Sequence, residues 1–176
     1  LFIGDKMNKE NLINTLLTFD EEVYLRFETN NIIKKYECYI VGGGAMILLN
    51  LIPRVTYDID VIRCTGNEII DIMKHYDINI NASAHIDCFP DGYTSRAIKI
   101  DLKTKMIDFY VLSLEDIVVS KLASGRAKDF EDIHQNSVID NLNWNKLDKL
   151  IELTIEGMIS DYNARELSDF YKEYKR

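Results

Sequence analysis

The sequence lacks any long apolar run, and this absence limits the kind of protein that it encodes. No stretch approaches the roughly 20 consecutive apolar residues that a membrane-spanning helix needs. The first ten residues also lack the basic region and the long apolar stretch of a secretion signal. A chain of 176 residues with 47% hydrophobic and 28% charged content is expected to bury one sizeable core. We therefore expect a cytoplasmic protein with no membrane partner.

Cysteine and histidine are too scarce and too scattered to indicate a disulfide framework or a zinc site. The three cysteines, Cys38, Cys64 and Cys88, are an odd number at spacings that match no zinc or redox motif. The three histidines are equally dispersed. Because free cysteine behaves as a small buried hydrophobe, the three thiols are predicted to be buried and without a function.

Positive charge is scarcer than negative charge, and the formal net charge is -8. Proteins that coat nucleic acid neutralise its phosphates with Lys and Arg, so this balance predicts no nonspecific DNA binding. Local basic residues can still hold a single phosphate group. A nucleotide or the end of an RNA is therefore a candidate ligand, whereas a long duplex is disfavoured.

The apolar periodicity predicts helices at both ends of the chain and strands only in the middle. Helical spacing runs from Asn8 to about Tyr36, where Asp20 could open a second helix, and it returns after Leu112 with a capping box of Ser113 and Asp116. Strands are expected at 38–41, 57–62, 97–102 and 106–112, the last two as a hairpin, and further helices at 45–49, 66–76, 128–137, 145–159 and 163–174, with Asn163 and Glu166 capping the last. This order predicts an α+β fold, with a mixed β-sheet core flanked by helices over residues 1–112 and a C-terminal helical bundle over 113–176.

Three consecutive glycines, Gly42, Gly43 and Gly44, stand between a predicted strand and a predicted helix. Without Cβ atoms, the backbone N–H groups there can approach an anion, and the N-terminus of a helix favours negative charge. The run outlines a phosphate-binding turn. A tight turn with positive φ would need glycine equally.

Asp58 and Asp60 lie two residues apart on a predicted strand, so both carboxylates are expected on one face while Ile59 points into the core. Two carboxylates this close repel each other unless a cation lies between them, which favours a hard divalent cation such as Mg²⁺. The alternative is that they mark the polar face of an edge strand. The segment 45–57 has the length of one helix and a turn, so the second strand is expected to return beside the first.

The stretch VGGGAMILLNLIPRVTYDID resembles the signature of the nucleotidyltransferase superfamily: an apolar residue, Gly-Gly or Gly-Ser, a helix and then Asp-x-Asp. Gly-Gly-x-Ala followed by Arg54-x-Thr56-x-Asp58-Ile59-Asp60 more closely resembles the AbiEii-type nucleotidyltransferases of bacterial abortive-infection and toxin–antitoxin systems. A second block, KLASGRAKDFED from Lys121, is similar to that family's downstream motif of Lys and then Arg-x-Lys-Asp-x-x-Asp. Together the motifs cover about residues 38–133.

The resemblance implies a nucleotidyltransferase-like fold and a Mg²⁺-dependent enzyme that transfers an NMP unit from an NTP to an acceptor hydroxyl on RNA, a protein or a small molecule. Asp58 and Asp60 would bind the metal, and Lys121 would contact phosphate. A toxin role with a cognate antitoxin as partner is also implied. The implied nucleotide-binding set is Gly42, Gly43, Gly44, Arg54, Thr56, Lys121, Arg126, Lys128, Asp129 and Asp132.

Some of these positions have a structural alternative. Arg54 and Thr56 either position phosphates or brace the turn. Asp129 and Asp132 share a face of a predicted helix, where they either fix Lys121 or Arg126 by charge pairing or are solvated surface charges. Because Lys121 stands among apolar neighbours, it is expected to need a partner.

The superfamily adds a third catalytic, metal-binding carboxylate between apolar residues on a neighbouring strand. Asp108, in Ile107-Asp108-Phe109, fits this pattern best, and Asp101 is the second choice. If no third carboxylate is present, a catalytically inactive nucleotidyltransferase fold that binds a nucleotide, RNA or a protein becomes the better hypothesis.

Overall fold

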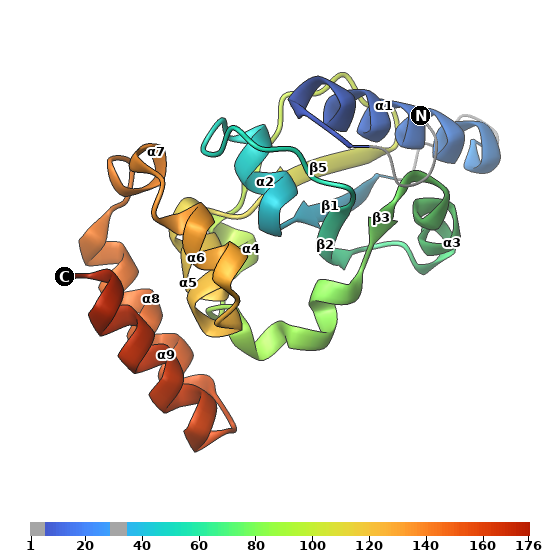
Figure 1. Cartoon of the computed structure of the whole chain (residues 1–176). Helices are drawn as coiled ribbons and strands as arrows, with labels where there is room; N and C mark the ends of the chain where they lie inside the picture. The colour runs from blue at the N-terminus through green and yellow to red at the C-terminus, as the bar shows by residue number, and fades with distance from the viewer. Residues whose placement is uncertain (1–5, 29–34) are drawn as a thin grey trace. The chain divides into compact units, whose positions relative to one another are not determined.

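The computed structural model describes residues 6–28 and 35–176, and the chain divides into two compact units. Unit 1 comprises Leu1–Ala84 and Ala97–Val111, and unit 2 comprises His85–Arg96 and Leu112–Arg176. Figure 1 shows the strands gathered in unit 1 and long helices in unit 2. No helix among the described residues is both long enough and apolar enough to cross a membrane.

Unit 1 is built on a five-stranded mixed sheet with the order β3-β2-β1-β5-β4. The strands are β1 (Tyr36–Ile40), β2 (Ile59–Cys64), β3 (Ile78–Asn79), β4 (Ile98–Lys99) and β5 (Ile107–Val111). β1 pairs with β2 antiparallel and with β5 parallel, β2 pairs with β3 parallel, and β4 pairs with β5 antiparallel. The expected mixed sheet and the return of the second strand beside the first are confirmed.

The helices of unit 1 are α1 (Lys9–Phe27), α2 (Gly42–Leu48) and α3 (Ile70–Met73), and short 3-10 turns flank α3 at Asn67–Ile69 and Lys74–Tyr76. A further 3-10 segment, Asn81–Cys88, crosses from one unit to the other in the sequence. α1 contacts both α2 and α3, and it runs along the sheet in Figure 1. Its buried residues recur at helical spacing, and the Phe19 ring lies 6.4 Å from the Phe109 ring of β5. This contact places the core between α1 and the sheet.

The N-terminal helical pattern gives one helix rather than two. α1 continues through Asp20 and ends at Phe27, and β1 begins at Tyr36. The helix predicted to extend to about Tyr36 is therefore shorter than expected. The part of that prediction at residues 29–34 lies outside the described residues. Asp20 does not open a helix, because its carboxylate is buried and accepts hydrogen bonds from three backbone N–H groups: Lys105 at 2.6 Å, Met106 at 2.8 Å and Ile107 at 2.7 Å. Asp20 therefore ties α1 to the start of β5.

Replacing Asp20 by alanine is expected to lower the free energy of unfolding by at least about 2 kcal/mol, because it leaves buried backbone donors without an acceptor. The matched variant is Glu21→Ala, whose side chain is about half exposed and pairs with Lys105 at the surface, and it is expected to change stability little. Urea unfolding of both variants measures the difference. Equal stability of the two variants would contradict the anchoring role.

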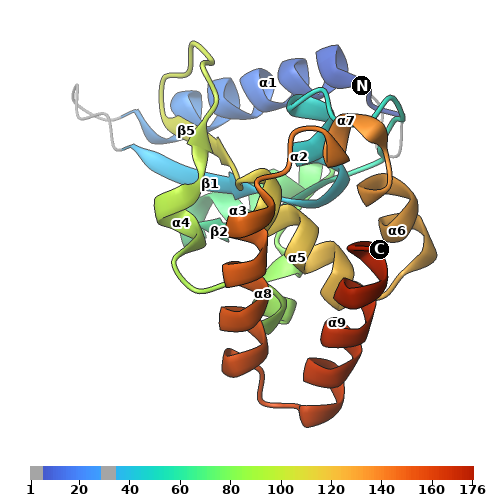
Figure 2. The ribbon, with the colours of Figure 1, turned by 90° about the vertical axis from the view of Figure 1, so that its left-hand side faces the viewer.

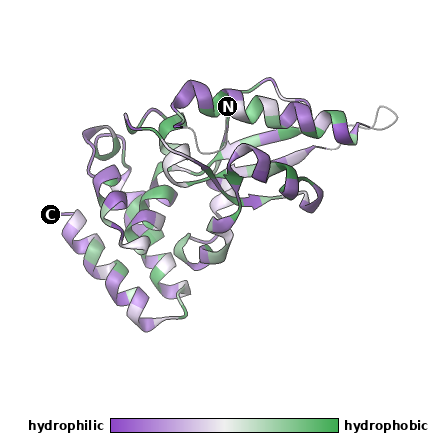
Figure 3. Ribbon diagram, turned by 45° about the vertical axis from the view of Figure 1, so that its right-hand side comes forward, coloured by the Kyte–Doolittle hydropathy of each residue, from purple (hydrophilic) through white to green (hydrophobic). Residues whose placement is uncertain are grey.

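Unit 2 contains α4 (Tyr93–Arg96), α5 (Leu114–Ser124), α6 (Ala127–Ile133), α7 (Asn136–Ile139), α8 (Trp144–Gly157) and α9 (Asp161–Tyr174). Figure 2 shows α8 and α9 side by side, and the two helices contact each other and α5. Hydrophilic and hydrophobic bands alternate along both helices in Figure 3. In α8 the buried residues are Leu147, Leu150, Ile151 and Thr154, the spacing of an amphipathic helix. The expected C-terminal helical bundle is confirmed.

Several local predictions need correction. The strand expected at 57–62 begins only at Ile59, because the backbone of Thr56 pairs with Met7 outside the sheet, and the strand expected at 97–102 is reduced to Ile98–Lys99. The helix expected at 128–137 is divided between α6 and α7. α9 is capped by Ser160 instead of Asn163, and Ser113 does cap α5.

Candidate functional site

Asp58 and Asp60 lie at the start of β2, on the side of unit 1 where β2 meets β3. Asp60 pairs with Asn79 in the parallel register, so these two side chains share a face of the sheet. The Asn79 amide donates to Oδ2 of Asp58 at 3.3 Å, which brings the Asp58 carboxylate to that same face. Ile59 is fully buried. The two carboxylates therefore lie together on one side of β2, as the sequence predicts.

Asn79 is a residue of this site that sequence reasoning missed. It lies in a segment without a clear pattern, although Ile78-Asn79-Ile80 alternates with period two and could have indicated a short strand. Its contact makes Asn79 an outer partner that orients Asp58.

The glycine run forms the first turn of α2, which begins at Gly42. Gly42 has a φ of 65°, a conformation that favours glycine, and a Cβ placed there would lie 3.1 Å from Oδ2 of Asp60. The Val41 N–H also donates to the carbonyl of Asp60 at 2.9 Å. The first turn of α2 and the Asp60 carboxylate are therefore direct neighbours.

Arg54 lies over the same helical turn. A Cβ at Gly43 would lie only 2.6 Å from an Nη2 of Arg54, so glycine is what lets the guanidinium rest against the backbone there. Gly44 packs at 3.9 Å from the backbone of Asp58. One guanidinium, one helical turn and two carboxylates thus converge within unit 1.

Thr56 contacts Asp58 through its side chain and Met7 through its backbone. Its hydroxyl lies 3.2 Å from the Asp58 carbonyl and 3.4 Å from Oδ1 of Asp58, and its backbone forms two hydrogen bonds with Met7. The side chain is buried. Of the two roles expected for Thr56, these contacts favour bracing.

The donor set suits Mg²⁺. Carboxylate oxygens are its preferred protein ligands, and it is commonly held by one or two carboxylates together with substrate phosphates. Asp58 is exposed and Asp60 is half-buried, so both can be reached from solvent. Within residues 6–28 and 35–176, no group of three or more His, Cys, Asp or Glu side chains is arranged to hold a metal. The other ligands of a metal on Asp58 and Asp60 would be water molecules or oxygens of a substrate.

Asp108 does not join this pair. Ile40 pairs with Val61 of β2 and with Val111 of β5, so these three residues form one row across the sheet. Asp60 lies one residue beyond that row and Asp108 three residues before it, which separates them by about 13 Å along the strands and about 10 Å across two strands. This register does not bring Asp108 together with Asp58 and Asp60, and its role as the third carboxylate stays a prediction.

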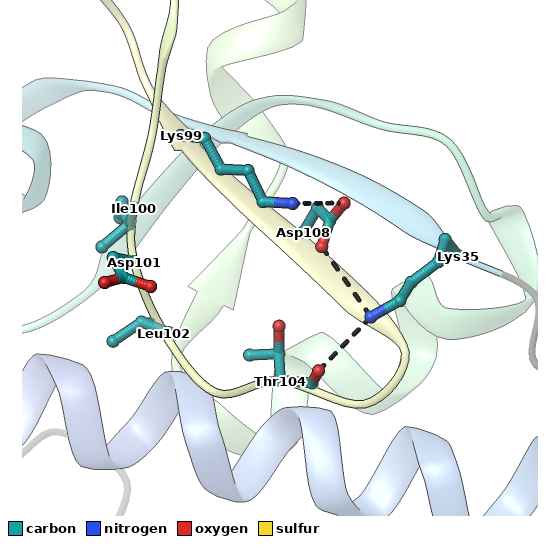
Figure 4. Close-up of a pocket in the computed structure, with 7 residues that line it drawn as sticks. All are labelled: Lys35, Lys99, Ile100, Asp101, Leu102, Thr104 and Asp108. Atoms are coloured by element: carbon teal, nitrogen blue, oxygen red, sulfur yellow. Dashed lines mark hydrogen bonds and ion pairs between the residues drawn. The ribbon is translucent and has the colours of Figure 1, made fainter.

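Asp101 is no better placed. It lines a pocket of about 420 Å³ around Asp108, and Figure 4 shows the Asp108 carboxylate between two lysines, with Lys99 at 2.8 Å and Lys35 at 3.8 Å. The negative charge of Asp108 is therefore paired with these two lysines, away from Asp58 and Asp60. The pocket is lined by Lys35, Lys99, Ile100, Asp101, Leu102, Thr104 and Asp108.

In unit 2, the second sequence motif forms a buried charge cluster. The Lys121 side chain is 4% exposed, and its ammonium lies 2.5 Å from Asp129 and 2.8 Å from Asp132. Ser124 and Arg126 donate to the other oxygen of Asp129 at 2.5 Å and 2.6 Å. The expected partner of Lys121 is thus a pair of carboxylates, which join α5 to α6.

The exposed cations of this motif are Arg126 and Lys128. Arg126 is 76% exposed while its Nε contacts Asp129, and Lys128 is exposed on α6. Lys128 does not join the Lys121 cluster. Any ligand in solution can therefore reach these two cations more readily than it can reach Lys121.

The pKa of Asp129 lies below its ordinary value. Burial acts to raise it, but the charge of Lys121 and the hydrogen bonds from Lys121, Ser124 and Arg126 lower it by more. A carboxylate with a lowered folded pKa stabilises the fold fully above its unfolded pKa, about 3.9, and loses that contribution as the pH falls through the folded pKa. The difference in unfolding free energy between the wild type and Asp129→Asn is therefore expected to be largest near neutral pH and to shrink below about pH 4. Denaturant unfolding from pH 7 to pH 3 tests this, and a constant difference would contradict it.

The mixed sheet, the glycine turn opening a helix and the two carboxylates at the start of the neighbouring strand together define a nucleotidyltransferase-like fold. The chain belongs to the family described as "Nucleotidyltransferase of unknown function (DUF6036)", whose model matches residues 14–176. This confirms the resemblance to the nucleotidyltransferase superfamily. The closer AbiEii-type resemblance stays a prediction. No curated protein and no solved structure matches the chain significantly.

Proposed function

We propose that this chain is a Mg²⁺-dependent nucleotidyltransferase that moves an NMP unit from an NTP to an acceptor hydroxyl on RNA, a protein or a small molecule. The observation that carries the proposal is the contact between the first turn of α2 and Asp60, where a Cβ on Gly42 would lie 3.1 Å from the carboxylate. A phosphate-binding turn and a metal-binding carboxylate must be neighbours for one nucleotide to meet both.

Each residue of the site has a role in this reaction. Gly42, Gly43 and Gly44 let the triphosphate approach the backbone of α2, and the guanidinium of Arg54 offsets its charge. Asp58 and Asp60 would hold Mg²⁺, which stabilises the negative charge that develops on the transferred phosphate. Thr56 and Asn79 hold Asp58 in place.

For the second motif we infer a division of roles from exposure. Arg126 and Lys128 can contact phosphate oxygens, because both lie at the surface. Lys121 acts through Asp129 and Asp132 to join α5 and α6, since its ammonium is almost fully buried between them.

The alternative function is a nucleotide-, RNA- or protein-binding module with the same fold and no catalysis. The position of Asp108 favours it, because the structure brings two carboxylates together where the superfamily has three. Two carboxylates suffice to bind a metal with a nucleotide. The third carboxylate is associated with activating the acceptor hydroxyl in the superfamily that the sequence resembles.

The experiment incubates the purified chain with Mg²⁺, each NTP labelled at the α-phosphate, and total RNA, a protein extract or small hydroxyl compounds. Transfer of the label to an acceptor, if EDTA abolishes it, supports the enzyme hypothesis. A parallel reaction with γ-labelled NTP separates NMP transfer from phosphoryl transfer. Nucleotide binding without transfer to any acceptor supports the binding module.

The AbiEii-type resemblance extends the proposal to a toxin that is neutralised by an antitoxin. Induced expression in a bacterial host is then expected to arrest growth, and Asp60→Asn is expected to relieve the arrest at equal expression. Growth arrest that survives Asp60→Asn would separate any toxicity from this site.

A further inference from the structure

Cys38 and Cys64 are direct partners across the antiparallel pair β1–β2, and their Sγ atoms lie 3.1 Å apart. Both are free thiols. The sequence predicts three buried cysteines, but only Cys38 is buried, while Cys64 and Cys88 are half-buried. Neither cysteine of the pair has a part in the nucleotide site described above.

The backbone geometry at this pair suits a disulfide. The Thr65 N–H donates to the Glu37 carbonyl at 3.0 Å, just beyond the pair, which makes Cys38 and Cys64 a non-hydrogen-bonded pair of the ladder. Such pairs bring the Cα atoms to about 4.5 Å, inside the range of about 4.4–6.8 Å that disulfides span. Bond formation therefore needs only a small movement of the two sulfur atoms.

The two thiols differ in reactivity. The hydrogen bond from the Cys38 thiol, together with the backbone N–H groups of Gly66 and Thr65, lowers the pKa of Cys64 although burial opposes this. The same thiol–thiol hydrogen bond, with burial, raises the pKa of Cys38 well above its ordinary value. Because the thiolate is the nucleophile, Cys64 is the thiol that reacts first with an oxidant.

We propose that Cys64 and Cys38 form an oxidisable dithiol that hydrogen peroxide closes reversibly to a disulfide bridging β1 and β2. In the first step the Cys64 thiolate attacks peroxide, the O–O bond breaks, and Cys64 sulfenic acid and hydroxide form. In the second step the Cys38 sulfur attacks the sulfenic sulfur, and the oxygen leaves as water with the Cys38 proton. The two sulfurs together lose two electrons, which reduce one peroxide; an added dithiol reverses the reaction.

The bridge would close the segment 39–63, which carries the glycine turn, Asp58 and Asp60. Cross-linking two positions of a strand pair restricts the unfolded chain, so the oxidised protein is expected to melt at a higher temperature than the reduced protein. This inference goes beyond the proposed function and holds whether or not the site transfers nucleotides.

The test treats the reduced 176-residue chain with hydrogen peroxide, quenches it with acid, and alkylates the remaining thiols with N-ethylmaleimide in denaturant. Intact mass is expected to show three adducts before oxidation and one afterwards, with a monomer lighter by two hydrogens. Peptide mapping is expected to place the adduct on Cys88 and the link between Cys38 and Cys64. Dithiothreitol is expected to restore all three adducts.

Two variants separate the steps. In Cys38→Ser the reaction is expected to stop at a Cys64 sulfenic acid that dimedone traps, whereas Cys88→Ser is expected to keep the bridge. Because burial raises the pKa of Cys88, that thiol is the matched slow control. Wild-type chain in which Cys38 and Cys64 both stay alkylatable under peroxide, or in which Cys88 enters the disulfide, would overturn the proposal.

Discussion

Replacing Lys121 by methionine is expected to lower the free energy of unfolding by about 3–5 kcal/mol, the loss found when one partner of a buried ion pair is removed. Asp129 and Asp132 are each 3% exposed and would be left without their shared cation. Methionine fills a similar volume, so the loss would come from charge and not from a cavity. Urea unfolding followed by far-UV circular dichroism measures it.

Two matched variants identify the cause. Lys172 on α9 pairs with Asp169, but both side chains are largely exposed, so Lys172→Met is expected to change stability little. The combined variant Lys121→Met, Asp129→Asn and Asp132→Asn removes the stranded charges and is expected to recover part of the loss. If the triple variant is less stable than Lys121→Met alone, unpaired charge is not what destabilises the single variant.

Asp58→Asn and Asp60→Asn are each expected to lower nucleotidyl transfer by more than about 100-fold. Loss of a residue that merely orients a metal ligand typically costs 10–100-fold, and loss of the ligand itself costs more. Asn79→Ala, which removes the partner that orients Asp58, is expected to fall within that smaller range. Initial rates with an α-labelled NTP at several Mg²⁺ concentrations measure all three variants.

The matched control is Asp71→Asn. Asp71 is an exposed carboxylate of the same unit that pairs only locally with Lys74, so its loss is expected to leave transfer unchanged. Melting temperatures of the variants show whether a loss of activity comes from unfolding. Transfer that survives both Asp58→Asn and Asp60→Asn in folded protein would remove the metal site from these residues.

The position of Asp108 shows which part of a site a strand pattern can predict. Alternation correctly places Asp108 opposite the buried Ile107 and Phe109, and the register puts it on the same face of the sheet as Asp60. Alternation says nothing about how far along the sheet a residue lies. That distance depends on the pairing of β1 with β5, which joins segments about 70 residues apart in the sequence.

Asp20 and Lys121 are two buried charged residues whose partners lie outside their own helices. An aspartate followed by two glutamates is typical of a helix start, yet Asp20 lies inside α1 because its carboxylate has three backbone donors near β5. The need of Lys121 for a partner could be predicted, since charged side chains are rarely buried unpaired. Only the packing of α5 against α6 decides that Lys121 pairs with both Asp129 and Asp132.

By itself the sequence determined the glycine turn, the neighbouring carboxylates and the helical C-terminal part, because turns, helix periods and strand faces depend on residues close together in the chain. The model of the nucleotidyltransferase family matches residues 14–176, a range that contains the glycine turn and the carboxylates. Tertiary structure decided that Asp108 stays apart from Asp60, that Asn79 reaches Asp58, and that two scattered cysteines become partners. Strand register and the burial of charges arise from contacts between distant segments, which no local pattern contains.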